Sequence, residues 1–432
     1  MITFWRRLFQ SSDLRKRIFV TVSLLLLTRV LVHIPLATVT EDRLRQFFAN
    51  SQNQAFGLLD IFSGGSLARF SVVLMGVGPY ITASIIVQLL TIIVPSFEAL
   101  SKEGEYGKQR LNQYTRYLTV PLALLQGYAT LLLLRSQNII GEWTVPQLVG
   151  MLITSTAGTM LLMWLGEIIS ESGIGNGMSL IITIGVLAGL PTTFVQKYSL
   201  ITAGGGIDTT ELLKFSAFIT SSIILIAVIV VMNDAIRKIP VTYARRVRSS
   251  TLDSVNTYIP IKVNTAGVIP IIFALSMLLF PQIIGRFFEN AKTEWVRTVA
   301  HWLVTNLSSQ SNALVYGSLY FILVIFFTYF YTSIIFNPTQ MAENLQKQSG
   351  FIPGIRPGTE TAQYVGALLS RITFVGSIFL GLVAVLPVIV PLITGDQTLI
   401  LGGTGILIVV AVVIETMRQI NAQLVMTGYD QY

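Results

Sequence analysis

Cysteine is absent from the 432 residues, which excludes disulfides, a thiolate nucleophile and metal sites built on cysteine. Histidine occurs only twice, at His33 and His301, and two residues in opposite halves make neither a histidine metal site nor a catalytic triad easy to build. A phosphate-binding GxxxxGK[ST] loop is also missing. We therefore expect no enzyme, no metal and no cofactor.

Charge is scarce as well, since 12% of the residues are charged, against roughly 25% in an average soluble domain. Hydrophobic residues make up 52% of the chain, and the mean hydropathy is +0.68. That leaves too little polar surface for a soluble protein of this length. The net charge of +8 is spread among apolar blocks, which favours contact with a membrane surface over a nucleic-acid-binding stripe.

Long apolar runs are what the chain does have, and about 20 such residues cross a bilayer as a helix. Ten runs qualify, five in the half 1–200 and five in the half 201–432. We predict an all-α polytopic membrane protein whose spans are 18–36, 70–95, 117–134, 146–169, 178–196, 215–236, 265–285, 314–336, 368–394 and 398–417.

Lys and Arg in the connecting segments predict the orientation, because these residues gather on the cytoplasmic side. With the N-terminus inside, the inner segments hold 19 of them and the outer segments hold nine. Both termini are therefore expected in the cytoplasm. Acidic residues are nearly absent from the span centres, because Glu167, Asp234 and Glu415 all fall at cytoplasmic ends. This disfavours an ion-coupled carrier, which usually places carboxylates at depth.

Residues 56–68, FGLLDIFSGGSLA, are apolar but too short to span, and Gly64-Gly65 ends the run. They are either an amphipathic helix on the outer surface or a re-entrant half-helix, which lipid tolerates only where its ends are buried in protein.

A short repeat relates the two halves. GVGPYI at 76–81 and GVIPII at 267–272 share the pattern GVxPxI, each in the second span of its half. Because each half has five spans, the second half enters the membrane inverted, as in inverted-repeat proteins. The repeat makes Ile81 and Ile272 equivalent, and Ile85 follows Ile81 on the same helix face. These isoleucines are either ordinary core residues or a narrow apolar collar, which would expel water and block ions.

Seven colinear segments together resemble the SecY protein-translocation channel family over almost the whole chain. They are LLDIFSGGSLARFSV, GVGPYITASIIVQLL, SKEGEYGKQRLNQYTRYLT, ESGIGNGMSLII, YIPIKVNTAGVIPIIFA, GFIPGIRPG and GGTGILIVVAVVIE. The resemblance implies two five-helix halves closed like a clamshell around a pore, with 56–68 as a plug in the outer funnel. The resemblance further implies that the chain is the central subunit of a translocase. Such a subunit is a passive channel through which polypeptides are secreted across the membrane or inserted sideways into it.

The resemblance also implies roles for individual residues. The pore ring would comprise Ile81, Ile85, Ile182, Ile272 and Ile408. The plug would present Phe56, Leu58, Leu59, Ile61 and Phe62. Spans 2, 3, 7 and 8 would form a lateral gate with Gln88, Asn264 and Ser276 beside it. Partners would dock on Arg245, Arg246, Arg248 and Arg356, although the bias of Lys and Arg toward cytoplasmic loops also accounts for basic loops.

The implied partners are SecE-like and SecG-like membrane subunits, the SecA motor, the ribosome, signal sequences with their nascent polypeptides, and the lipid bilayer, all at the plasma membrane. A secondary transporter or lipid flippase with inverted repeats stays open as the alternative. It would need a polar substrate site at the midplane.

Overall fold

The structure is a computed structural model that describes residues 11–36, 63–67, 69–136, 140–141, 143–202, 209–243, 257–288, 293–307, 312–394 and 403–429. Its helices are α2 (Ser12–Val32), α5 (Gly78–Ile93), α6 (Pro95–Lys102), α7 (Glu105–Ser136), α8 (Val145–Ser172), α9 (Gly177–Thr202), α10 (Thr209–Asp234), α11 (Ile269–Phe288), α12 (Glu294–Asn306), α13 (Ala313–Ile335), α14 (Pro338–Lys347), α15 (Thr359–Thr394) and α16 (Gly403–Tyr429).

Each of the ten predicted spans overlaps one helix of this set. Within the described residues, five helices are long and apolar enough to cross a membrane, and the pair α5 and α6, bent by 100°, makes a sixth candidate. The second predicted span began too early, at residue 70, because α5 starts only at Gly78. Gly76 has a φ of +56° and Pro79 stands in the first turn, so the backbone turns before the helix starts.

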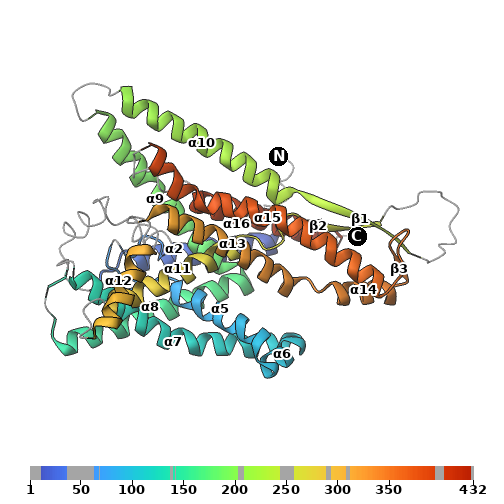
Figure 1. The fold of residues 1–432 in the computed structure, drawn as a ribbon, viewed down its shortest axis with the longest axis horizontal. Helices are drawn as coiled ribbons and strands as arrows, with labels where there is room; N and C mark the ends of the chain where they lie inside the picture. Colours follow the sequence, from blue (N-terminus) through green and yellow to red (C-terminus); the bar gives the residue numbers. More distant parts are fainter. Residues whose placement is uncertain are drawn as a thin grey trace.

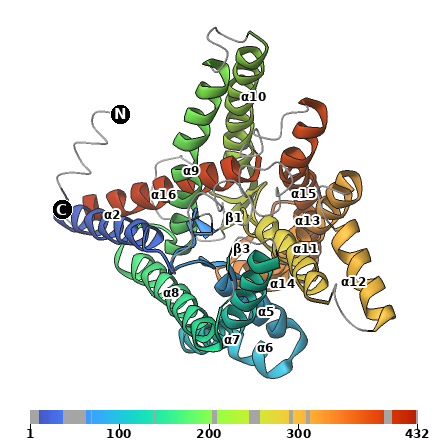
Figure 2. The same cartoon turned by 90° about the vertical axis from the view of Figure 1, so that its left-hand side faces the viewer.

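One hydrophobic cluster joins helices from both halves of the chain. Figures 1 and 2 show these helices packed into one bundle. Ile271 and Leu278 of α11, Leu380 of α15 and Leu407 of α16 are among the cluster's fully buried side chains. This cluster is the core against which the site residues pack.

A small antiparallel sheet lies at one end of the bundle, in the order β2-β1-β3 (Figure 1). Strand β1 (Ile236–Tyr243) follows α10, β2 (Thr257–Lys262) precedes α11, and β3 (Gly350–Phe351) follows α14. The register pairs Ile236 with Lys262 and Tyr243 with Gly350. The sheet thus joins two connections far apart in sequence.

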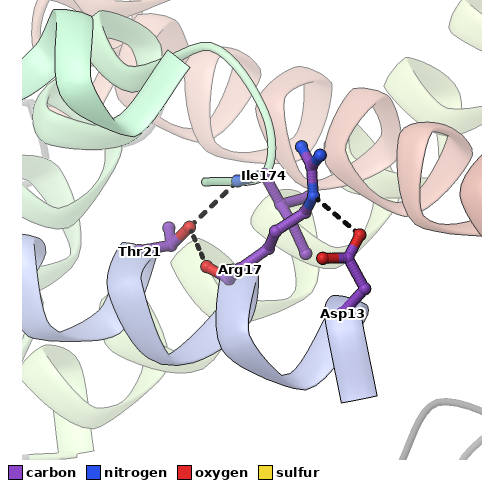
Figure 3. A network of polar contacts seen from close by, with 4 residues as sticks. All are labelled: Asp13, Arg17, Thr21 and Ile174. Atoms are coloured by element: carbon purple, nitrogen blue, oxygen red, sulfur yellow. Dashed lines mark hydrogen bonds and ion pairs between the residues drawn. The ribbon is translucent and has the colours of Figure 1, made fainter. Parts of the chain in front are cut away.

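The loop between α8 and α9 is held against α2. Thr21 Oγ1 donates to the carbonyl oxygen of Arg17 at 2.8 Å and accepts from the backbone N–H of Ile174 at 3.0 Å (Figure 3). The next glycine, Gly175, donates its N–H to Gln419 Oε1 of α16 at 2.9 Å. This loop therefore contacts both halves of the chain.

The first prediction concerns Gly158 of α8, where a Cβ would lie 2.2 Å from the carbonyl oxygen of Val72. Because backbone cannot move aside cheaply, Gly158→Ala should lower the free energy of unfolding by about 1–3 kcal/mol. Gly150 of the same helix has nothing within 4 Å of its Cβ position, so Gly150→Ala is the matched control and should be neutral or slightly stabilising. Thermal unfolding in detergent measures both, and equal melting temperatures would contradict the close contact.

Candidate functional site

The GVxPxI repeat has the same local structure in both halves. Gly76 and Gly267 both have positive φ, +56° and +64°. Helices α5 and α11 each begin two residues after this glycine, and the second residue of each helix is a proline, Pro79 or Pro270. Each helix then opens with an equivalent hydrogen bond, from the N–H of Ile81 to Val77 and from that of Ile272 to Val268. The sequence match therefore marks a structural repeat.

The five predicted ring residues come from four helices and meet in the central hydrophobic cluster. Ile85 of α5, Ile182 of α9 and Ile408 of α16 are buried, with exposed fractions of 8%, 3% and 1%. Ile81 of α5 and Ile272 of α11 are partly buried and pack against the same cluster. All five thus belong to or pack against the same extended apolar cluster, and their role as a pore ring stays a prediction.

Met178 belongs to this neighbourhood too, since it packs on the central cluster from the first turn of α9. Its Sδ lies 2.7 Å from the Cβ position of Gly166 in α8, so any side chain at 166 would displace it. A glycine facing a flexible thioether lets α8 and α9 approach closely.

The three predicted gate residues lie on or next to α5 and α11. Gln88 is half-buried and donates from Nε2 to Ser84 Oγ at 3.2 Å, while its Oε1 is buried without a partner among the described residues. Asn264, just before α11, is 8% exposed and has a buried Oδ1 that is unpaired within the same described part of the chain. Ser276 is half-buried on α11.

These three side chains do not hydrogen-bond to one another in the described part of the chain, although Thr265, next to Asn264, contacts Thr332 of α13 at 3.4 Å between the two Oγ1 atoms. A buried oxygen without a donor costs about 1–3 kcal/mol. Gln88 and Asn264 each leave one such oxygen buried without a donor among the described residues.

Of the predicted plug, residues 56–62, which include Phe56, Leu58, Leu59, Ile61 and Phe62, lie outside the described residues. The segment that follows them is held firmly. Arg29 Nη1 of α2 donates to the carbonyl oxygen of Gly64 at 2.8 Å. A Cβ on Gly185 of α9 would lie 2.5 Å from Gly64 Cα, and one on Gly76 would lie 2.6 Å from Ser63 Cα. Sequence inspection missed this anchor, for which Arg29 within an apolar run was the only signal.

Arg356, the predicted docking residue of the GIRPG segment, is exposed between β3 and α15. Gly354 and Gly358 on either side have φ of +82° and +102°, and Thr361 Oγ1 donates to the Arg356 carbonyl oxygen at 2.8 Å. The loop is therefore a fixed turn that presents the guanidinium group outward. Arg245, Arg246 and Arg248 lie outside the described residues, on the connection between β1 and β2.

The sheet couples the two predicted docking loops, because β1 leads into the first and β3 into the second. Beneath it, a separate apolar cluster that includes Ile239, Ile261 and Ile352 packs against α14 and α15.

Basic side chains crowd this end. Burial lowers the pKa of Lys262 below its usual range, and nearby Arg418 adds to the effect, while Glu415 and Asp234 oppose it. Arg418 also pairs with Asp234, which ties α16 to the end of α10.

Within the described residues no group of histidine, aspartate and glutamate side chains is arranged to hold a metal ion. What the described residues offer is an extended apolar cluster shared by both halves, two repeated helix starts, buried oxygens of Gln88 and Asn264 without donors, and a basic end with a small sheet.

Comparison with known proteins gives close matches in sequence. The protein-family model SecY matches residues 71–417. A curated relative named protein translocase subunit SecY from Streptomyces galbus is 40% identical over 448 residues, covering 100% of both chains. A relative of the same name from Corynebacterium glutamicum is 41% identical and covers 98% of both.

Solved structures match in fold. A structure described as a protein-conducting channel has a TM-score of 0.66 at 20% identity, and the match covers 96% of this chain and 93% of that one. A structure in which the SecY plug domain is described as stabilising the closed channel has a TM-score of 0.64 at 19% identity, covering 94% and 92%. Sec61 in the canine ribosome-channel complex has a TM-score of 0.62 at 21% identity, covering 94% and 92%.

A prediction for this site concerns the close contact between Gly185 and Gly64. Because the chain lacks cysteine, Ser63→Cys introduces a single thiol that reports on the anchored segment. Adding Gly185→Ala should push Gly64 away from Arg29 and increase the rate at which a membrane-impermeant maleimide labels residue 63. Gly78→Ala, where nothing lies within 4 Å of the new Cβ, is the control. Equal labelling rates in the Gly185→Ala and Gly78→Ala variants would contradict the claim that the contact with Gly185 holds Gly64 in place.

Proposed function

Since this chain belongs to the SecY family, we propose that it is the central, pore-forming subunit of a protein translocase. It is a membrane channel subunit and not an enzyme. Polypeptides pass through it across the membrane or sideways into the lipid, and an external motor or a ribosome supplies the drive.

The observation that supports this function is that Ile81, Ile85, Ile182, Ile272 and Ile408, from four helices of both halves, all belong to or pack against one extended apolar cluster. An apolar constriction expels water and so blocks ions without a charged barrier. A translocating chain advances about 3.3–3.6 Å per residue, so only a few of its residues touch a thin ring at once. Flexible isoleucines can then fit side chains of different size around the passing chain.

The seam beside Gln88, Asn264 and Ser276 is the proposed lateral gate. An apolar segment gains about 25 cal/mol for each Å² that it removes from water, so it leaves the pore for lipid when the seam opens. The buried oxygens of Gln88 and Asn264 can accept hydrogen bonds from a signal sequence entering the seam. A signal sequence opens the channel only by as much as it prefers the open state.

The proposed membrane arrangement has ten spans in two inverted halves, 1–200 and 201–432, with both termini in the cytoplasm of a plasma membrane. The equivalent local structure of the two GVxPxI segments supports the repeat, and five spans in each half would invert the second copy. The sheet and Arg356 then face the cytoplasm, and the plug, 56–68, enters from the outer side with Arg29 and the glycine contacts at its base.

The partners proposed for this chain have different surfaces. The basic turn at Arg356 and the Arg245, Arg246 and Arg248 loop would receive SecA and the ribosome. SecE-like and SecG-like subunits would bind within the membrane. Helix α10 supports this, because almost none of its apolar stretch is buried inside the chain, and it projects outward beside α9 (Figure 2).

The ring assignment predicts an ion leak. Replacing Ile81 and Ile408 by glycine removes the apolar side chains from two sides of the constriction and should raise the resting conductance in planar bilayers. Leu161→Gly, on the exposed face of α8, serves as a control for loss of a large side chain elsewhere. Unchanged conductance in the folded double variant would remove these isoleucines from the ring.

The docking assignment predicts a charge effect. Arg356→Glu should slow motor-driven translocation into vesicles several-fold, because an acidic side chain would repel the acidic groups that a basic turn attracts. Arg371→Glu on α15 provides a matched charge change away from the turn. If transport driven by the motor proceeds at the normal rate in Arg356→Glu, docking at this turn is ruled out.

A further inference from the structure

Helix α12 links α11 to α13 at the end of the bundle opposite the sheet, on its periphery (Figures 1 and 2). Its sequence, EWVRTVAHWLVTN, is amphipathic. Apolar residues cover a broad arc of the helix, and Glu294 and Arg297 are exposed on the other side.

Part of the apolar arc packs on α11. A Cβ at Gly285 of α11 would lie 3.0 Å from Val304 Cγ2 and 3.3 Å from Leu303 Cβ, and Ala300 beside them is 3% exposed. Buried Gln282 of α11 donates from Nε2 to the carbonyl oxygen of Leu307 at 2.6 Å, just beyond the end of α12. Helix α12 is therefore fixed to the second half of α11.

The rest of the arc is not covered by the chain. Trp295, Val299 and Trp302 follow one another at helical spacings of four and three residues, which puts them on one face. Their exposed fractions are 74%, 40% and 60%. Two tryptophans on one open face form an apolar patch that water would not favour.

The neighbouring surfaces indicate what covers this face. Phe288 at the end of α11 and Leu314 and Val315 at the start of α13 are also exposed, and Asn312 Nδ2 donates to Asn306 Oδ1 at 3.1 Å, which keeps the start of α13 beside α12. The patch thus adjoins exposed apolar residues at the ends of α11 and α13, both of which correspond to predicted spans. Tryptophan is enriched where the acyl chains meet the headgroups, because its ring is apolar and its N–H can bond to polar groups there.

We propose that Trp295, Val299 and Trp302 lie in the headgroup region of the outer leaflet, with α12 parallel to the membrane plane as an interfacial anchor. The inference rests on the proposed orientation of the channel. Since Gln282 and Gly285 tie α12 to α11, the anchor holds the outer half of a proposed gate helix at a fixed depth. Lipid at the outer surface thereby acts on the gate through α12.

Fluorescence quenching in the full-length protein tests the depth. Four of the five tryptophans are replaced by phenylalanine, leaving only Trp295 or only Trp302, and the protein is reconstituted into phosphatidylglycerol and phosphatidylcholine vesicles. Interfacial helices bury their apolar face about 5–10 Å into the headgroup and acyl boundary. Lipids brominated near the headgroup should therefore quench either residue several-fold more than lipids brominated near the acyl end.

The matched control moves the probe to the polar face, with Arg297→Trp as the only tryptophan. It should be quenched by aqueous iodide and hardly by brominated lipid. Iodide quenching of Trp295 and Trp302 would place them in water and overturn the anchor. Protection from both quenchers would show that protein, such as a second copy or a small membrane subunit, covers the face, and would overturn it equally. The measurement needs no transport, so either failure leaves the proposed channel function standing.

Discussion

Water cannot remain in a narrow constriction lined only by hydrocarbon, and the proposed seal depends on this constraint. In the proposed ring, isoleucines meet this constraint in place of charges. Three of them, Ile85, Ile182 and Ile408, are buried in the same cluster, although they come from α5, α9 and α16. Because the proposed barrier is made of side chains and not of backbone, it could part for a polypeptide and close again without breaking secondary structure.

Close backbone contacts at glycines place the helices that carry those side chains. Gly185 of α9 meets Gly64 at a distance that admits no Cβ, and Gly158 of α8 does the same with the carbonyl of Val72. Gly76 and Gly267 take positive φ before the two repeated helices start. An alanine at any of these sites would clash or strain the backbone, so the geometry of the cluster is specified at positions outside it.

Much of this could be predicted from the sequence, because ten apolar runs and the GVxPxI repeat are local patterns. The runs correspond to helices, and Ile81 and Ile272 do have equivalent surroundings. Contacts between segments that are far apart in the chain leave no local pattern in the sequence, so they could not be predicted in this way. The pairing of Tyr243 with Gly350 joins loops more than a hundred residues apart, and the contact of Arg29 with Gly64 needs the folded bundle. Helix α12 was missed although Trp295, Val299 and Trp302 carry helical spacing, because its run is too short and polar to read as a span.

The most direct test of the central claim is to place a photo-crosslinking amino acid, one at a time, at the five isoleucine positions and to stall a secretory polypeptide midway through the reconstituted channel. If the five side chains surround the passing chain, every position should form an adduct with the stalled polypeptide, and Leu161 on the exposed face of α8 should form adducts with lipid only. Lipid adducts at the isoleucine positions, without polypeptide adducts, would contradict the account.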